Sequence, residues 1–180
     1  MAGLAIGSYT LEARAYDNSG NTANSSITVN VTSSGTTRGL PWIEQFSQAN
    51  GTKTGVGATT WQAIRSPGIM SVQNGKLVIN GAGSVGVLTT GTIDISSGPV
   101  KISLDLISQG ALETNQDYVR LYKKVNGGAE VLVGEKLGNQ PATIITGNSI
   151  TGSTLQLVIR SYVSAGDEFY YLDNLSVSAQ

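Results

Sequence analysis

Hydrophobic and polar residues alternate along short segments of this chain, and turn-forming residues separate those segments. Between residues 8 and 16 apolar and small side chains occupy every second position, and residues 27–31 repeat the alternation. Residues 17–21, which read Asp-Asn-Ser-Gly-Asn, lie between the two segments. A period of two is typical of a half-buried strand, so the pattern predicts a β-hairpin. Because an isolated hairpin is marginal in water, we interpret this one as the last two strands of a larger sandwich.

The rest of the chain shows the same alternation in about nine further segments, and no window of ten or more residues has a helical period. The candidate strands cover residues 42–46, 72–79, 85–89, 100–107, 118–125, 131–136, 143–146, 154–162 and 169–177. Many short strands separated by Asn-Gly and Gly-Ser turns are typical of a two-sheet sandwich. We therefore predict an all-β protein with an N-terminal β-hairpin (residues 1–32), a Ser/Thr/Gly linker (33–39) and a jelly-roll β-sandwich (40–180).

Composition narrows the possible chemistry. The chain has 180 residues, a net charge of −1, only 13% charged residues, and neither His nor Cys. The absence of His and Cys excludes Ser-His-Asp and Cys-His mechanisms and the zinc, haem and iron–sulfur sites built on those ligands, so a metal would need oxygen ligands. The low charge argues against a nucleic-acid partner. The first residues do not resemble a signal peptide, and no stretch approaches the roughly 18 apolar residues of a membrane span.

Tyrosine and arginine gather on the polar faces of three candidate strands. The opposite positions on each of these strands are aliphatic. Rigid aromatic rings and planar guanidinium groups suit the recognition of sugars, which offer apolar C–H faces and directed hydroxyls. The candidate binding residues are Asp105, Tyr118, Arg120, Tyr122, Arg160 and Tyr162. The alternative is a solvated sheet face held by Tyr–Arg packing and an ion pair of Asp105 with an arginine. Trp61, in a Gly/Thr-rich stretch, is either a loop anchor or an additional stacking platform for a sugar.

The N-terminal segment resembles a known module. Gly7-Ser8-Tyr9-Thr10-Leu11, residues 15–21 (Ala-Tyr-Asp-Asn-Ser-Gly-Asn) and residues 27–31 (Ile-Thr-Val-Asn-Val) are similar to the final hairpin of bacterial immunoglobulin-like modules. Such modules connect the catalytic and binding domains of secreted polysaccharide-degrading enzymes and surface proteins. The resemblance implies a secreted or cell-surface protein with neighbouring domains, and it implies no ligand for the hairpin itself.

Residues 40–180 resemble the jelly-roll modules of secreted bacterial proteins. The opening motif is Leu-Pro-Trp-Ile-Glu-Gln-Phe at 40–46, and the closing motif is Tyr-Tyr-Leu-Asp-Asn-Leu-Ser-Val at 170–177. These modules include carbohydrate-binding modules and the adhesin-type jelly rolls of Bacteroidetes. Many hold a structural calcium where the first strand meets the last, so the resemblance implies Ca²⁺ bound by Glu44 and Asp173, completed by Asn50 and Thr52. The alternative is that Asp173 caps a turn or pairs with Lys53 or Arg65.

Taken together, these features favour a non-catalytic module that binds a polysaccharide or oligosaccharide. A structural or adhesion spacer without its own glycan ligand is the alternative. A small polysaccharide-active enzyme is disfavoured, because no pair of carboxylates lies in a recognisable catalytic motif.

Overall fold

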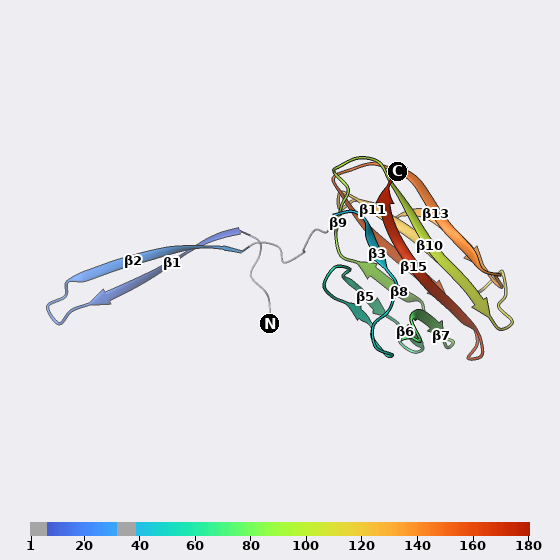
Figure 1. Cartoon of the computed structure of the whole chain (residues 1–180). Coiled ribbons are helices and arrows are strands. Elements are labelled where there is room, and N and C mark those ends of the chain that lie inside the picture. The colour runs from blue at the N-terminus through green and yellow to red at the C-terminus, as the bar shows by residue number, and fades with distance from the viewer. Residues whose placement is uncertain (1–6, 32–38) are drawn as a thin grey trace. The chain divides into compact units, whose positions relative to one another are not determined.

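The computed structural model describes residues 7–31 and 39–180, and the chain divides into two compact units, Met1–Thr36 and Thr37–Gln180. Figure 1 draws the first unit as a blue hairpin and the second as a sandwich of strands. Each unit is considered by itself. Most of the predicted linker, residues 33–38, lies outside the described residues, as do residues 1–6 and 32 of the predicted hairpin segment.

The predicted hairpin is confirmed. Strands β1 (Gly7–Tyr16) and β2 (Thr22–Val31) pair antiparallel without a register shift. The Asp17 carboxylate closes the turn by accepting hydrogen bonds from the backbone N–H groups of Ser19 and Asn21, at 2.9 and 2.8 Å. Leu11 and Ile27 face each other across the pair, and both are more than half exposed. The immunoglobulin-like origin of the hairpin stays a prediction.

The second unit is a sandwich of two antiparallel sheets, as predicted. One sheet has the order β13-β10-β15-β7-β6, with β3 beside β15, and the other has the order β12-β11-β14-β8-β5-β4, with β9 beside β14. The strands are β3 (Trp42–Glu44), β4 (Thr54–Gly55), β5 (Trp61–Ile64), β6 (Ile69–Gln73), β7 (Lys76–Asn80), β8 (Gly86–Thr90), β9 (Ile93–Asp94), β10 (Val100–Gln109), β11 (Tyr118–Val125), β12 (Val131–Leu137), β13 (Thr143–Ile150), β14 (Thr154–Tyr162) and β15 (Phe169–Ala179). Below, they are called the six-stranded and the seven-stranded sheet.

Two predicted segments differ from the structure. Residues 72–79 are not one strand, because Asn74 and Gly75 adopt positive φ angles of 50° and 72° and turn the chain between β6 and β7. The Gly/Thr-rich stretch around Trp61, which carries no clear alternation, contains the strands β4 and β5. Backbone pairing with β8 holds β5 in place even though its sequence has only one large apolar side chain facing inward.

The core lies between the two sheets and is made from the inward positions of both. Val119 and Leu121 of β11 meet the inward aliphatic side chains of β10 and β15 there, and all are essentially inaccessible to water. Phe46 packs edge-on against Trp61, with their ring centroids 5.5 Å apart and an angle of 70° between the planes. Burial of these side chains, at roughly 25 cal/mol per Å² of apolar surface, supplies the main stabilisation of the sandwich.

A β-bulge divides strand β15. Leu172 is buried, but the next buried positions are Leu175 and Val177, so the inward spacing changes from two residues to three. The register with β10 shifts at the same place, and Asn174 has a positive φ of 47°. A bulge adds one residue to one strand and re-aims its side chains. Here it turns Asp173 and Asn174 toward the outer face of the six-stranded sheet, and this position is the basis of the candidate site.

Candidate functional site

Five of the predicted binding residues do come together on the outer face of the seven-stranded sheet. Tyr118 lies directly opposite Tyr162, and Arg120 directly opposite Arg160, on the paired strands β11 and β14. The two tyrosine rings stack at 6.2 Å with an angle of 21° between their planes. Tyr122 continues the same face of β11, and all five side chains are half-buried. We call this set the Tyr/Arg face.

The charges of the Tyr/Arg face are already compensated within the protein. Arg120 pairs with Glu135 at 2.9 Å and lies over the Tyr118 ring, 4.3 Å from its centroid, while Arg160 pairs with Glu130 at 2.9 Å. These hydrogen bonds to glutamates raise the pKa values of both guanidinium groups. The arrangement matches the alternative of a solvated face held by Tyr–Arg packing, although its ion pairs are with glutamates.

Asp105 and Trp61 do not belong to that face. Asp105 lies on β10, in the other sheet, so neither its predicted membership of the Tyr/Arg face nor its predicted ion pair with an arginine is correct. Trp61 lines a shallow hollow of about 400 Å³, but its side chain is only 4% exposed. It packs on Gly55, where a Cβ would collide with the indole. Trp61 is therefore an anchor in the core at the start of β5, and its prediction as a stacking platform is wrong.

A groove lies instead on the outer face of the six-stranded sheet. Two adjoining hollows, of about 420 and 500 Å³, share Lys76, Ile107 and Tyr171 among their lining residues. The lining comes from all five strands from β13 to β6. With neighbouring strands about 4.8 Å apart, the groove crosses roughly 19 Å of sheet. Volumes of a few hundred Å³ are typical of ligand sites.

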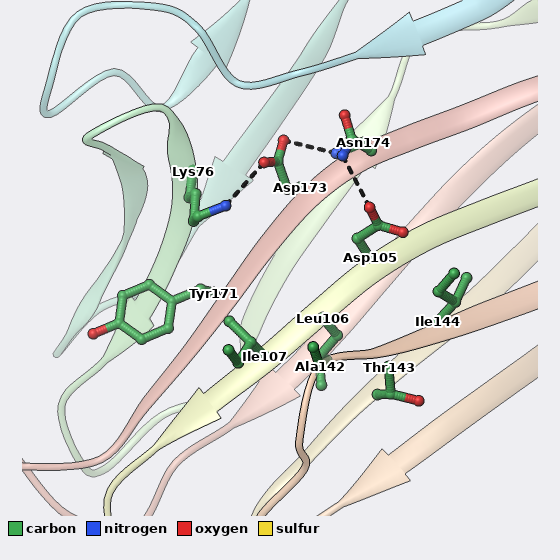
Figure 2. A pocket seen from close by; sticks show the side chains of 10 residues that line it. All are labelled: Lys76, Asp105, Leu106, Ile107, Ala142, Thr143, Ile144, Tyr171, Asp173 and Asn174. Atoms are coloured by element: carbon green, nitrogen blue, oxygen red, sulfur yellow. Dashed lines mark hydrogen bonds and ion pairs between the residues drawn. The ribbon is translucent and has the colours of Figure 1, made fainter.

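Four polar side chains form a connected row along one side of this groove (Figure 2). Lys76 Nζ donates to Asp173 Oδ2 at 3.0 Å, and Asn174 Nδ2 donates to Asp105 Oδ2 at 2.9 Å. The backbone N–H of Asn174 also donates to Asp173 Oδ1, at 2.8 Å. The row extends over β7, β15 and β10, because Asp105 lies opposite Asp173 in the sheet. Mutual hydrogen bonds hold these groups in position before any ligand arrives, and we call them the polar row.

An apolar row runs beside the polar row, one pleat further along the strands. Ile107, Tyr171 and Val78 lie opposite one another on β10, β15 and β7. Val78 is only 7% exposed although it lies outside the core between the sheets. Tyr171 stacks on Phe169, with the ring centroids 5.9 Å apart and 11° between the planes, and its hydroxyl donates to Gln109 at 2.9 Å. The groove thus presents two near-parallel aromatic rings beside a row of hydrogen-bonding groups.

The predicted calcium ligands are not brought together. Glu44 is buried at 2% exposure, in register with the inward-facing Leu175, whereas Asp173 faces outward across the bulge. The Glu44 carboxylate accepts hydrogen bonds from the Phe46 backbone N–H at 2.6 Å and from the Trp61 indole N–H at 2.8 Å. The side chains of Gln48 and Thr59 donate to it as well. Four donors surround Glu44, so it acts as a buried hydrogen-bond acceptor and its prediction as a metal ligand is wrong.

Asn50, Thr52 and Asp173 have other partners. Asn50 Oδ1 accepts a hydrogen bond from the backbone N–H of Asn74 at 2.7 Å, and the Thr52 hydroxyl donates to the Ala49 carbonyl at 2.6 Å. Both contacts stabilise turns. Asp173 pairs with Lys76, a partner that differs from the predicted alternatives of Lys53 and Arg65.

A different group of acidic residues could hold a metal ion. Oxygen atoms of Glu113, Asp117 and Glu168 lie within 4.8 Å of one another, and Asp117 and Glu168 are buried. Within residues 7–31 and 39–180, none of the three forms an ion pair with Lys or Arg. Ser164 donates to all three carboxylates, with its hydroxyl 3.0 Å from Glu113 Oε2. The donor set consists of oxygen atoms only, which fits a hard cation such as calcium.

Reasoning from the sequence did not select Lys76, Phe169, Tyr171 or Asn174 as site residues. The spacing of inward residues at 170, 172, 175 and 177 is the signal that could have found them. A change from two residues to three within a strand indicates a bulge, and a bulge places two consecutive side chains on one face. The acidic group offers no such signal, because its members lie in two loops up to 55 residues apart.

Comparison with known proteins concerns the fold. No family model matches the chain, and no curated protein does. The K3 cleaved adhesin domain of Lys-gingipain from Porphyromonas gingivalis W83 superposes with a TM-score of 0.50 at 8% identity, over 66% of this chain and 91% of that chain. CBM4 gives 0.47 at 12% identity (67% and 94% coverage), and TmCBM61 in complex with β-1,4-galactotriose gives 0.45 at 10% (76% and 91%). The adhesin domain shares the predicted β-sandwich fold.

None of the described segments forms a helix with the length and apolarity that a membrane crossing would require.

Proposed function

We propose that the β-sandwich binds a polysaccharide or oligosaccharide in the groove of the six-stranded sheet and does not cleave it. The observation that carries the proposal is the stacked Phe169–Tyr171 pair beside the polar row. A sugar ring has an apolar C–H face and a rim of hydroxyls. Its face can stack on Tyr171 while its rim meets Asp105, Asp173 and Asn174, so the two rows match the two sides of a sugar.

The order of the rows favours a chain that crosses the strands. The polar and apolar rows both run from β10 to β7, perpendicular to the strand direction. A pyranose unit is about as long as the spacing between strands. A sugar chain that binds across the sheet would therefore contact a new polar and a new apolar side chain at each successive strand.

We place binding in the groove rather than on the Tyr/Arg face that the sequence predicted. Both faces contain ion pairs and a pair of stacked rings, so these contacts do not decide between them. The choice rests on shape, because an open hollow lies above the polar row.

Binding without catalysis is supported by the state of the two groove carboxylates. A glycosidase needs one carboxylic acid that donates a proton and one carboxylate that acts as base or nucleophile. Asp173 is ion-paired with Lys76, and Asp105 accepts a hydrogen bond from the Asn174 amide, so each groove carboxylate already has a partner within the protein. We further propose that the protein is secreted or displayed on a cell surface and that it works beside other domains, including an immunoglobulin-like module completed by β1 and β2.

We propose calcium as the ion of the acidic group at Glu113, Asp117 and Glu168. Support comes from three carboxylates whose oxygen atoms lie within 4.8 Å of one another and which form no ion pair with a lysine or arginine among the described residues. Like charges held this close repel one another, and a divalent cation would compensate them. When bound, calcium would fasten the loop before β11 to the loop between β14 and β15, with Ser164 as a neutral oxygen donor.

The test is native affinity electrophoresis of the full chain through gels that contain a panel of polysaccharides, with and without EDTA. We expect retardation by at least one polymer and no release of new reducing ends during incubation. A chain that migrates freely through every gel would refute glycan binding and favour the structural or adhesion spacer. Release of reducing ends would refute the non-catalytic assignment.

A further inference from the structure

The charge of the groove is unbalanced. Its two hollows contain one cation, Lys76, and two carboxylates, Asp105 and Asp173. Lys76 is ion-paired with Asp173 at 3.0 Å, whereas Asp105 receives its hydrogen bond from the neutral amide of Asn174. No other lysine or arginine is among the described residues that line either hollow. The groove therefore carries one net negative charge, at Asp105.

We infer that the groove selects uncharged sugar chains and excludes polysaccharides that carry carboxylate or sulfate groups, an inference that rests on the proposed function. Hydroxyls of a neutral sugar can donate to Asp105 and Asp173 in charge-assisted hydrogen bonds. An acidic group at the same place would face two carboxylates, and the one cation within reach is already paired. Like charges that face each other across an interface repel, and such repulsion is a common source of specificity.

The bulge of β15 fixes the residue that sets this selectivity. Asn174, in its positive-φ conformation, directs its amide to Asp105 across the strand pair. The contact holds the Asp105 carboxylate in the row without neutralising it. An arginine or lysine at position 174 would have neutralised the charge, so the neutral amide is what leaves the groove anionic.

Selectivity is measured with matched ligands made from one polymer. The panel of neutral polysaccharides (hydroxyethyl cellulose, glucomannan, galactan and starch) is run beside alginate, polygalacturonate and carrageenan at 150 mM salt. The neutral polymer that retards the full chain most is then carboxymethylated, and part of that product is converted to its methyl ester. The ester has nearly the bulk of the acid but no charge, so it separates repulsion from steric exclusion.

We expect the acid form to bind at least tenfold more weakly than the ester. Asp105→Asn keeps the shape of the side chain and removes the net charge, so it should reduce this ratio to threefold or less. Asp173→Asn releases Lys76 and should reduce the ratio further, or invert it. Melting temperatures of both variants confirm that they are folded.

The outcomes separate this inference from the function on which it rests. Equal binding of acid and ester, or a ratio that neither variant changes, overturns the selectivity while glycan binding in the groove stands. Binding of an acidic polymer from the panel more tightly than of any neutral one also overturns it. If no polysaccharide of either kind is retained, the proposed function fails and this inference fails with it.

Discussion

Replacing Tyr171 by alanine separates the two candidate binding faces. Tyr171 is the central ring of the apolar row, and Phe169 flanks it in a near-parallel stack at 5.9 Å. Aromatic anchors at the centre of a binding surface commonly contribute about 2 kcal/mol or more, which corresponds to roughly a thirtyfold change in Kd. We therefore expect Tyr171→Ala to weaken glycan binding by at least about thirtyfold.

The fold should tolerate this change. The substitution removes one stacked pair, worth about 0.5–1.5 kcal/mol, and should expose more of Val78, the cross-strand neighbour of Tyr171. Domains of this size are usually stable by about 5–15 kcal/mol, so the variant stays folded at 25 °C. A drop of several degrees in melting temperature should accompany the loss of binding.

Tyr162→Ala is the matched control. Tyr162 is also half-buried on an outer sheet face and also belongs to a stacked pair, with Tyr118 at 6.2 Å. Its replacement should cost similar stability and leave binding within about twofold of the unmodified chain. Affinity electrophoresis ranks the variants, and isothermal titration calorimetry measures their Kd values. The opposite result, with binding lost in Tyr162→Ala and kept in Tyr171→Ala, would move the site to the Tyr/Arg face and refute the argument from the groove.

Three further predictions concern stability. Glu44→Gln places an amide donor among four hydrogen-bond donors and should cost about 3 kcal/mol, or roughly 10 °C in melting temperature. Gln45→Ala, at the exposed position that follows β3, should have little effect, and equal melting of both variants would contradict the buried-acceptor role. Calcium at about a hundred times its Kd should raise the free energy of unfolding by about 2.7 kcal/mol relative to EDTA, and Glu113→Gln should diminish that increase. A melting temperature that changes with neither calcium nor EDTA would refute the calcium proposal. Burial and the nearby charges of Asp117 and Glu168 raise the pKa of Tyr170, so the tyrosine loses its proton at lower pH in the unfolded chain than in the folded one. The free energy of unfolding should therefore fall as the pH rises above about 10. Tyr170→Phe should flatten that decline in denaturant titrations, and an unchanged dependence on pH would contradict the role of Tyr170.

The sequence predicts the strands well where alternation is strong and predicts the site poorly. Strands such as β10 and β14 follow from their period of two, because one face of each is buried. Strand order does not follow from alternation, so alternation alone groups Asp105 with Tyr118 although they lie in different sheets. The hydrogen-bond partners of a buried polar group cannot be read from the sequence either, since the four donors around Glu44 come from positions up to 17 residues away.

The metal prediction illustrates the same limit. Glu44 and Asp173 do lie on neighbouring strands, as the resemblance implied, but the bulge turns them to opposite sides of the sheet. Strict alternation places Asp173 on one face with Tyr171, Leu175 and Val177, whereas in the structure Asp173 and Tyr171 face outward and Leu175 and Val177 face the core. A single inserted residue therefore separates the predicted metal ligands and places Asn174 beside Asp173 in the groove.

The bulge at Asn174 also affects how this protein can change over evolutionary time. Deleting that one residue would restore a strict period of two in β15, with Leu172, Leu175 and Val177 all still on the core face. The core would keep its pattern, but the polar row would lose the amide that holds Asp105. Asn174 is thus a residue that the groove uses and that the inward pattern of the strand does not need. Lineages that carry this fold can therefore change the groove by substitution or loss at this position while the sandwich persists.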